Sequence, residues 1–141
     1  MTRDWLLLPI FARGSDAALL ATRLLTGAFL IHGVWDNIVS TERMGEFVDF
    51  LTANGFAMSE LMAPLSVWAQ FAIGTSLILG LLTRWAGLLL AFNFIVGVAM
   101  VHWDQSFREW WPAIILVALG LLFATIGGGR YAIDRHLEKR A

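Results

Sequence analysis

The sequence predicts an all-α integral membrane protein: a bundle of four transmembrane helices, with a short amphipathic interfacial helix between the first and the second. One observation is the stretch from Ser66 to Val101, which is almost entirely apolar and carries a single formal charge, Arg84. The other is the composition, with 58% hydrophobic residues, 15% charged residues and a mean hydropathy of +0.69. Soluble globular domains rarely combine these values. A chain of 141 residues has room for one such domain.

Charge and cysteine content exclude several classes of function. The formal net charge of −1 gives no basic patch of the kind that binds polyanions, so we expect no nucleic-acid partner. The chain has no cysteine, which rules out disulfides, thiolate metal sites and thiol redox chemistry. We therefore expect no covalently bound cofactor, and no metal site either, because a carboxylate-rich metal motif is also missing.

The first spanning helix is expected from Ala17 to Trp35. Residues 1–16 precede it as a short, interrupted apolar segment that we assign to the cytoplasmic membrane interface. Arg23 lies one to two turns inside this helix, from where its side chain is expected to snorkel back to the interface.

The polar connection from residue 38 to residue 61 contains a short amphipathic helix. Met44, Phe47, Val48 and Leu51 follow the i, i+3, i+4, i+7 spacing of one helical face. We expect this helix to lie flat on the outer surface of the bundle.

A transmembrane hairpin supplies helices two and three. Residues 62–82 would span about 31 Å as a helix, which matches the hydrocarbon thickness of a bilayer. Residues 85–101 form the next run, with Thr83 and Arg84 as a tight turn between the two.

The fourth helix is expected to open at Trp110-Trp111-Pro112 and to run to Ile126, where Gly127 begins a glycine triplet. We therefore place the four-helix transmembrane domain at residues 17–128 and a charged cytoplasmic tail at residues 129–141. Small residues four apart, at Gly87/Ala91 and Gly120/Ala124, predict close helix contacts.

Basic residues predict the orientation. Four spans place eight of them on the side of the termini: Arg3, Arg13, Arg23, Arg84, Arg130, Arg135, Lys139 and Arg140. The other side has only Arg43 and Arg108. Because basic residues concentrate on the cytoplasmic side, both termini are expected there.

Polar residues within the apolar runs form the candidate ligand site. His32 and Asp36 share one face of helix one, and Gln70 and Asn93 fall near the middle of the bilayer. His102 and Trp103 end helix three on the outer side. A quinone headgroup requires hydrogen-bond donors, an apolar slot and an ionisable group, so the candidate quinone-binding residues are His32, Asp36, Gln70, Asn93, His102 and Trp103.

Other interpretations of these residues stay open. Gln70 and Asn93 would serve equally well as hydrogen-bonding glue between helices. His32 and His102 would alternatively ligate a haem b, although His102 lies at a helix end, where its geometry would be loose. No catalytic triad, phosphate loop or carboxylate-rich metal motif is present in the sequence.

Several segments, in this order, resemble the DoxX family of four-helix membrane proteins. They are Arg23-Leu-Leu-Thr-Gly27-Ala-Phe-Leu-Ile-His32-Gly33, Phe47-Val-Asp-Phe50-Leu with Asn54-Gly55, Gly74-Thr-Ser-Leu-Ile-Leu-Gly80-Leu-Leu-Thr83-Arg84, His102, and Gly128-Gly129-Arg-Tyr131-Ala-Ile-Asp134. The resemblance covers roughly residues 20–135.

The resemblance implies an inner-membrane subunit associated with oxidoreductases, including the small subunit type of thiosulfate:quinone oxidoreductase. Two positions depart from the family pattern. Asp36 stands where many members have a lysine, and Gln70 stands where many have a glutamate. The loss of a carboxylate at Gln70 weakens an inherited role in proton transfer.

The leading hypothesis is therefore an accessory membrane subunit of a larger redox or energy-converting complex, in contact with lipid and partner transmembrane helices and lining a quinone site. The rival is a purely structural subunit without ligand or catalysis. A transporter is disfavoured because the sequence shows neither inverted repeats nor broken helices.

Overall fold

The computed structural model describes residues 4–139, and every regular element in this part of the chain is helical. In chain order the elements are α1 (Asp4–Leu7), η1 (Pro9–Gly14), α2 (Ser15–Val39), α3 (Thr41–Ala53), α4 (Ser59–Leu79), α5 (Thr83–Gly97), η2 (Val98–His102), α6 (Phe107–Ile126) and α7 (Asp134–Glu138). Four of the helical segments are long and apolar enough to cross a membrane, which confirms the all-α membrane fold.

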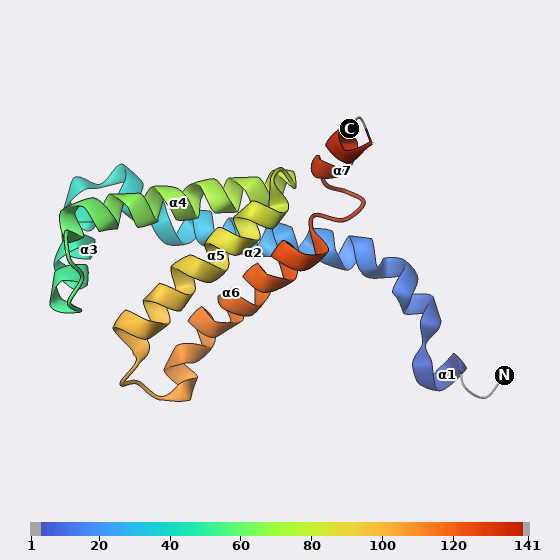
Figure 1. Cartoon of the computed structure of the whole chain (residues 1–141), viewed down its shortest axis with the longest axis horizontal. Coiled ribbons are helices and arrows are strands. Elements are labelled where there is room, and N and C mark those ends of the chain that lie inside the picture. Colours follow the sequence, from blue (N-terminus) through green and yellow to red (C-terminus); the bar gives the residue numbers. More distant parts are fainter. Residues whose placement is uncertain (1–3, 140–141) are drawn as a thin grey trace.

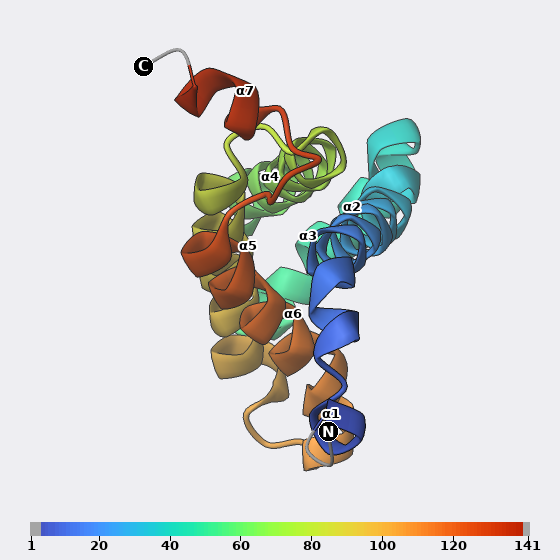
Figure 2. The ribbon, with the colours of Figure 1, turned by 90° about the vertical axis from the view of Figure 1, so that its right-hand side faces the viewer.

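The four long helices form two pairs. Helix α2 packs along α4, and α5 packs along α6, while the two pairs meet each other mainly where α4 contacts α5. Figures 1 and 2 show the pairs diverging from the end of the molecule at which α4 turns into α5. The arrangement is thus a V of two helix pairs, more open than the bundle that the sequence suggested.

Each pair crosses at two glycines. A Cβ on Gly27 of α2 would lie 2.6 Å from the carbonyl oxygen of Gly74 in α4, too close for any side chain. A Cβ on Gly87 of α5 would lie 2.5 Å from the carbonyl oxygen of Gly120 in α6. Backbones therefore touch at both crossings, as the small residues of α5 and α6 predicted.

A buried cluster joins the two pairs near the vertex of the V. It consists of Leu30 from α2, Ile73 and Leu77 from α4, Ala86 and Leu90 from α5, and Leu116 and Phe123 from α6. Large apolar side chains elsewhere on the spans are exposed, among them Leu25, Phe92 and Leu121. Such an outer surface suits contact with acyl chains.

Several helix bounds differ from the predicted ones. Helix α2 extends to Val39 instead of ending at Trp35, and α4 begins at Ser59 instead of at residue 62. The turn after α4 is formed by residues 80–82, with Gly80 at φ 69° and Leu82 at φ 53°, so Thr83 and Arg84 are the first residues of α5. Helix α6 starts at Phe107, three residues before Trp110, because Ser106 and Glu109 form a capping box. The sequence contains this motif, but the start predicted at Trp110 did not take it into account.

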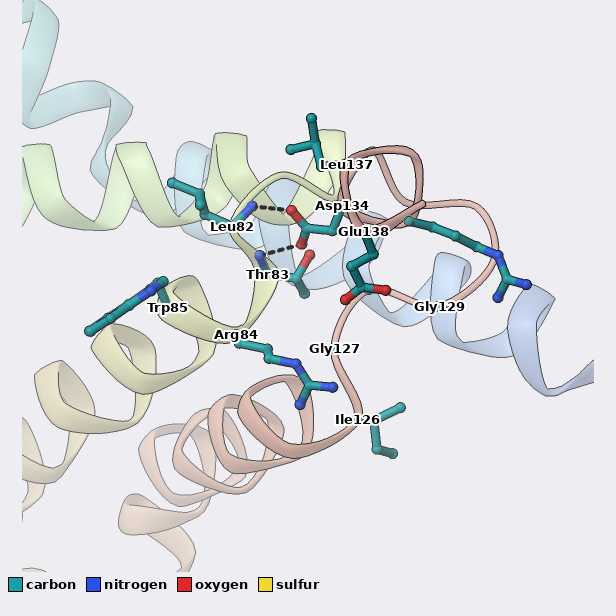
Figure 3. A pocket seen from close by; sticks show the side chains of 12 residues that line it. Leu82, Thr83, Arg84, Trp85, Ile126, Gly127, Gly129, Asp134, Leu137 and Glu138 are labelled. Carbon is teal, nitrogen blue, oxygen red and sulfur yellow. Dashed lines mark hydrogen bonds between the residues drawn. The ribbon is translucent and has the colours of Figure 1, made fainter. Parts of the chain in front are cut away.

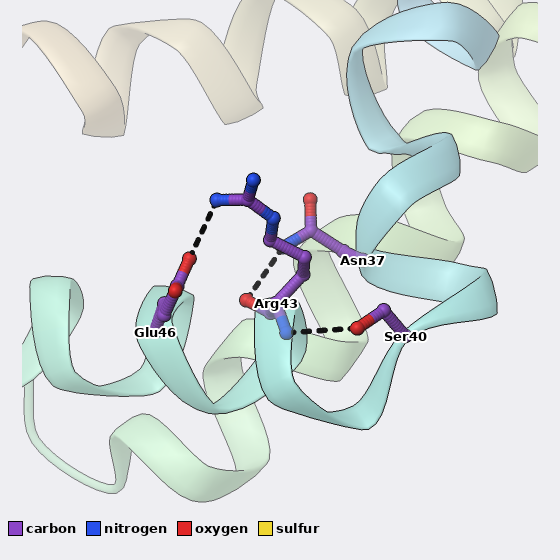
Figure 4. A network of polar contacts seen from close by, with 4 residues as sticks. All are labelled: Asn37, Ser40, Arg43 and Glu46. Carbon is purple, nitrogen blue, oxygen red and sulfur yellow. Dashed lines mark hydrogen bonds and ion pairs between the residues drawn. The ribbon is translucent and has the colours of Figure 1, made fainter.

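Helix α3 confirms the amphipathic segment as a helix, with Leu51 buried on its predicted apolar face. Its start is fixed by short polar contacts at the α2–α3 corner (Figure 4). The Ser40 hydroxyl accepts a hydrogen bond from the Arg43 amide, and the Asn37 carboxamide donates to the Arg43 carbonyl. An ion pair joins Arg43 to Glu46 at 2.9 Å. The location of α3 in a membrane interface stays a prediction, as does that of α1 and η1.

The crossing of α5 and α6 gives a test of packing. We predict that Gly87→Leu lowers the stability of the protein in detergent by about 1–3 kcal/mol, since the added side chain forces the backbones apart. Leu89→Ala, at a residue that is 51% exposed, should change stability by less than about 0.5 kcal/mol. Thermal unfolding of the two variants measures both, and equal midpoints would show that this face is not a tight interface.

Candidate functional site

A chain of hydrogen bonds connects α4 and α5 within the membrane span. The Ser66 hydroxyl donates to the Asn93 carboxamide oxygen at 3.1 Å, and the Gln70 carboxamide nitrogen donates to the Ser66 hydroxyl at 3.2 Å. The structure therefore brings together two of the predicted site residues, Gln70 and Asn93, and adds Ser66. Both carboxamides are half-buried.

The second polar atom of each carboxamide has no hydrogen-bond partner in the described chain. The Asn93 nitrogen and the Gln70 oxygen take part in none of the hydrogen bonds that join residues 4–139. A carboxamide nitrogen is a donor and a carboxamide oxygen is an acceptor. The pair can thus donate to a ligand carbonyl and accept from a ligand hydroxyl, but neither group can exchange a proton.

His32 and Asp36 lie apart from this chain of bonds. Both are exposed, whereas Leu30 and Val34 on the same helix are buried. His32 is two residues, or about 200°, from each of them, so it lies on the side of α2 that faces away from α4. The ion pair of the described residues is Arg43 with Glu46, so the His32 ring and the Asp36 carboxylate are not within ion-pair distance.

His102 and Trp103 lie at the end of the third span that is far from the turn between α4 and α5. Here α5 continues as a π-helical turn, η2, which ends at His102. The His102 ring is hydrogen-bonded through Nδ1 to the Gln105 carboxamide oxygen, and Trp103 stacks on Trp110 with ring centroids 6.1 Å apart. Trp103 is 68% exposed, as is typical of an aromatic side chain at a membrane interface. No hydrogen bond or aromatic pair of the described residues joins these two to the other four candidates.

The structure also reveals a junction that the sequence analysis missed. The Asp134 carboxylate accepts hydrogen bonds from the backbone amides of Leu82 at 2.6 Å and Thr83 at 2.8 Å, and the Asp134 amide donates to the Gly80 carbonyl at 2.9 Å. These contacts tie the segment after α6 to the turn between α4 and α5. The left-handed backbone of Leu82, costly for a branched residue, is held by the first of these bonds.

Arg23 lies at the centre of this junction, and its expected snorkelling is wrong. The side chain is 0% exposed, and its Nη2 donates to the Tyr131 carbonyl at 3.3 Å. A Cβ on Gly80 would overlap Arg23 Nη1, and one on Gly128 would lie 3.1 Å from it. The guanidinium is buried because the segment after α6 folds back over it.

Part of the segment that was expected to be a charged tail packs against the helical domain. Ala132 is 1% exposed, and the Arg130 amide donates to the Asp16 carboxylate at the start of α2. Residues up to 134 are therefore part of the helical domain in space, while α7 extends beyond it (Figure 1). An acidic residue a few positions beyond a glycine triplet was the signal in the sequence, since such a carboxylate suits a helix N-terminus.

The described residues hold no group of three or more histidine, aspartate or glutamate side chains that could bind a metal ion. The fold and its polar contacts define a multi-pass α-helical membrane protein. Comparison with known families makes this specific: the family model DoxX matches residues 18–103, and the chain belongs to the DoxX family.

A curated relative supports the same class. The chain is 28% identical over 131 residues to inner membrane protein YqjF of Escherichia coli strain K12. The matched region covers 89% of this chain and 95% of that protein. No solved structure matches the chain. The four apolar helices and this relative together support a multi-pass protein of the inner membrane.

The junction leads to a stability prediction. Asp134→Ala should destabilise the protein by about 1.5–3 kcal/mol, because it removes charged hydrogen bonds from two amides at the start of α5. The control is Asp49→Ala, at an exposed residue of α3. Thermal unfolding in detergent measures the effect, and a midpoint for Asp134→Ala equal to that of the control would contradict the role assigned to this carboxylate.

Proposed function

We propose that this protein is an accessory subunit that binds partner transmembrane helices of a larger complex in the inner membrane. The observation that carries the proposal is the position of His32. Its ring is exposed on the side of α2 away from α4, seven residues, or about 10 Å, before the end of the helix at Val39. Ionisable side chains inside a membrane are costly and nearly always face protein or a water-filled cavity.

A partner helix would supply hydrogen-bond partners for His32 and Asp36. Asp36 lies one turn further along the same exposed face, so a partner with a hydroxyl, carboxamide or basic side chain would satisfy both groups. The open V supports the same proposal, since two helix pairs that share a limited contact leave long apolar faces for other helices. The purely structural alternative also requires a partner and differs only in lacking a ligand.

Co-purification tests this proposal. His32→Leu and Asp36→Asn should reduce the amount of partner subunits recovered with the tagged protein from its native membrane, while its thermal stability in detergent stays the same. Leu121→Ala is the control, because Leu121 is a 51% exposed residue of α6 and not of the His32 face of α2. Recovery of the same subunits in the same amounts from every variant would overturn the assignment of this face.

A quinone ligand is the second candidate, and the hydrogen-bond chain of Gln70, Ser66 and Asn93 favours it. An unpartnered donor and an unpartnered acceptor are what the carbonyl of a quinone and the hydroxyl of a quinol require. Because the carboxamides cannot exchange protons and the candidate ionisable residues lie apart from them, a partner would perform that step. The subunit would then line a quinone site without being catalytic by itself.

We predict that Asn93→Leu and Gln70→Leu each lower the quinone content of the purified complex several-fold, with the double variant no lower than the worse single one. Residues that share one ligand lose it together, so their effects do not add. Thr75→Val is the matched control, because Thr75 is a half-buried polar residue of α4 whose hydroxyl bonds only to the Phe71 carbonyl. An unchanged quinone content in intact, equally stable complexes would contradict the quinone site and support the purely structural alternative.

The orientation completes the proposal. With eight basic residues on the side of the termini and two on the other, both termini lie in the cytoplasm. A reporter fused after Ala141 should be active in the cytoplasm, and one inserted at Asn54 should be active in the periplasm. A periplasmic C-terminus would reverse the whole topology.

A further inference from the structure

One face of α2 is uncovered along the membrane span. It consists of four exposed residues that lie within about 60° of one another around the helix axis, on the side away from α4: Leu25, Phe29, His32 and Asp36. Leu25 is 73% exposed and Phe29 is 58% exposed. Figure 2 shows α2 along one edge of the molecule. This face is therefore open to a neighbour over about three helical turns.

The rest of the described chain packs on the opposite side of α2. The Asp134 carboxylate holds the segment after α6 on the backbone amides of Leu82 and Thr83 (Figure 3). This segment covers the buried Arg23, whose guanidinium donates to the Tyr131 carbonyl. Helix α4 packs along the same side of α2. Both contacts leave the open face free for another chain.

The open face carries one basic and one acidic side chain. His32 and Asp36 are four residues apart, so Asp36 lies about 6 Å further along the helix axis. They form no ion pair with each other, because the ion pair of the described residues is Arg43 with Glu46. Pairing within one helix is also weaker in this order, since an i, i+4 pair is more stable when the acid precedes the base. Such groups are costly within a membrane span unless another chain pairs with them.

A second copy of the chain supplies both partners. Two copies inserted in the same direction are related by a two-fold axis along the membrane normal, so their α2 helices run parallel. In a parallel pair, each seam residue packs against residues of the facing helix at its own level and one turn above and below. Seam positions alternate between three and four residues apart, as do Leu25, Phe29, His32 and Asp36. Asp36 of each copy then meets His32 of the other copy, and the two-fold axis forms this contact twice.

Small residues beside the seam permit a close approach. Ala28 and Gly33 lie on its two flanks, and a Cβ on Gly33 would have no atom within 4 Å. Helices associate in membranes where small residues let their backbones come together. A different helix would have to present an acid and a base at the mirrored spacing, whereas a second copy does so by symmetry.

We propose that this face of α2 binds the same face of a second copy, in a parallel two-fold dimer that contains two contacts between His32 and Asp36. The inference rests on the proposed function, because it names the partner that the His32 face binds. Leu25 and Phe29 form the apolar middle of the interface. Since a two-fold contact of this kind closes at two copies, the outer surfaces of α5 and α6 stay free for other subunits.

Single cysteines test the contact, because the chain has no cysteine of its own. Leu25→Cys and Phe29→Cys, each in the full chain in its native membrane, should give a disulfide-linked product of twice the chain mass on mild oxidation. A seam residue faces its own counterpart across the axis, and a disulfide requires Cα atoms within about 7 Å. The matched controls are Phe92→Cys on α5 and Leu121→Cys on α6, at residues that are 67% and 51% exposed, and they should remain single chains.

An exchange of the two polar residues tests their pairing. In the Leu25→Cys chain, His32→Asp should lower the crosslinked fraction about tenfold, because carboxylates then face carboxylates across the axis. Addition of Asp36→His should restore the crosslinked fraction to within about twofold of its starting value, because opposite groups face each other again. Recovery in the double variant distinguishes a lost contact from a lost fold.

The possible results separate the dimer from the proposed function. Equal crosslinking at the control positions would mean random collision, and a double variant that stays uncrosslinked would contradict the contact of His32 with Asp36. No crosslink at Leu25 or Phe29, with other subunits still lost from His32→Leu, would overturn the dimer and leave the face to a different helix. A crosslink without any other recovered subunit would support the dimer and overturn the larger complex. Loss of neither the second copy nor other subunits in His32→Leu would overturn both.

Discussion

The Asp134 carboxylate accepts hydrogen bonds from the backbone amides of Leu82 and Thr83, and this contact fixes how the two helix pairs meet. It holds the segment after α6 against the turn between α4 and α5. That segment in turn covers the guanidinium of Arg23 from α2. Three parts of the chain far apart in sequence are thereby joined at the vertex of the V. Without this contact, Arg23 would lie uncovered inside an apolar helix, and Leu82 would have no partner for its left-handed backbone.

The glycine crossings give the pairs their internal geometry, whereas the junction determines the relation between the pairs. Within a membrane, apolar side chains gain little by leaving lipid for protein, so close backbone contact and polar contacts carry the association. The crossings Gly27 with Gly74 and Gly87 with Gly120 supply the first kind of contact. The second kind is found at the junction and in the bonds from Ser66 to Gln70 and Asn93.

The candidate site separates in space into parts with different chemistry. Gln70 and Asn93 meet through Ser66 between α4 and α5, where they can position a ligand. His32 and Asp36 face outward from α2, where they can meet a partner. A spacing along one helix determines which residues share a face, but it carries no information on which neighbouring helix, if any, that face meets. The sequence therefore identified these residues, whereas their separation into one group between α4 and α5 and another on the outer face of α2 required the structure.

Length, hydropathy and periodicity alone determined the four spans, the amphipathic α3 and the small residues at the contact of α5 with α6, because each depends on residues close together in the chain. The local sequence also determined the end of α6, because the backbone at this position has a φ of 80°, which suits the glycine found there, Gly127. The burial of Arg23, the cap that Asp134 places on α5 and the division into two pairs were decided by tertiary structure. The first two join residues more than fifty positions apart, Arg23 with Tyr131 and Leu82 with Asp134. Local sequence patterns do not determine such contacts, because the same arginine would snorkel to the interface if no returning segment covered it.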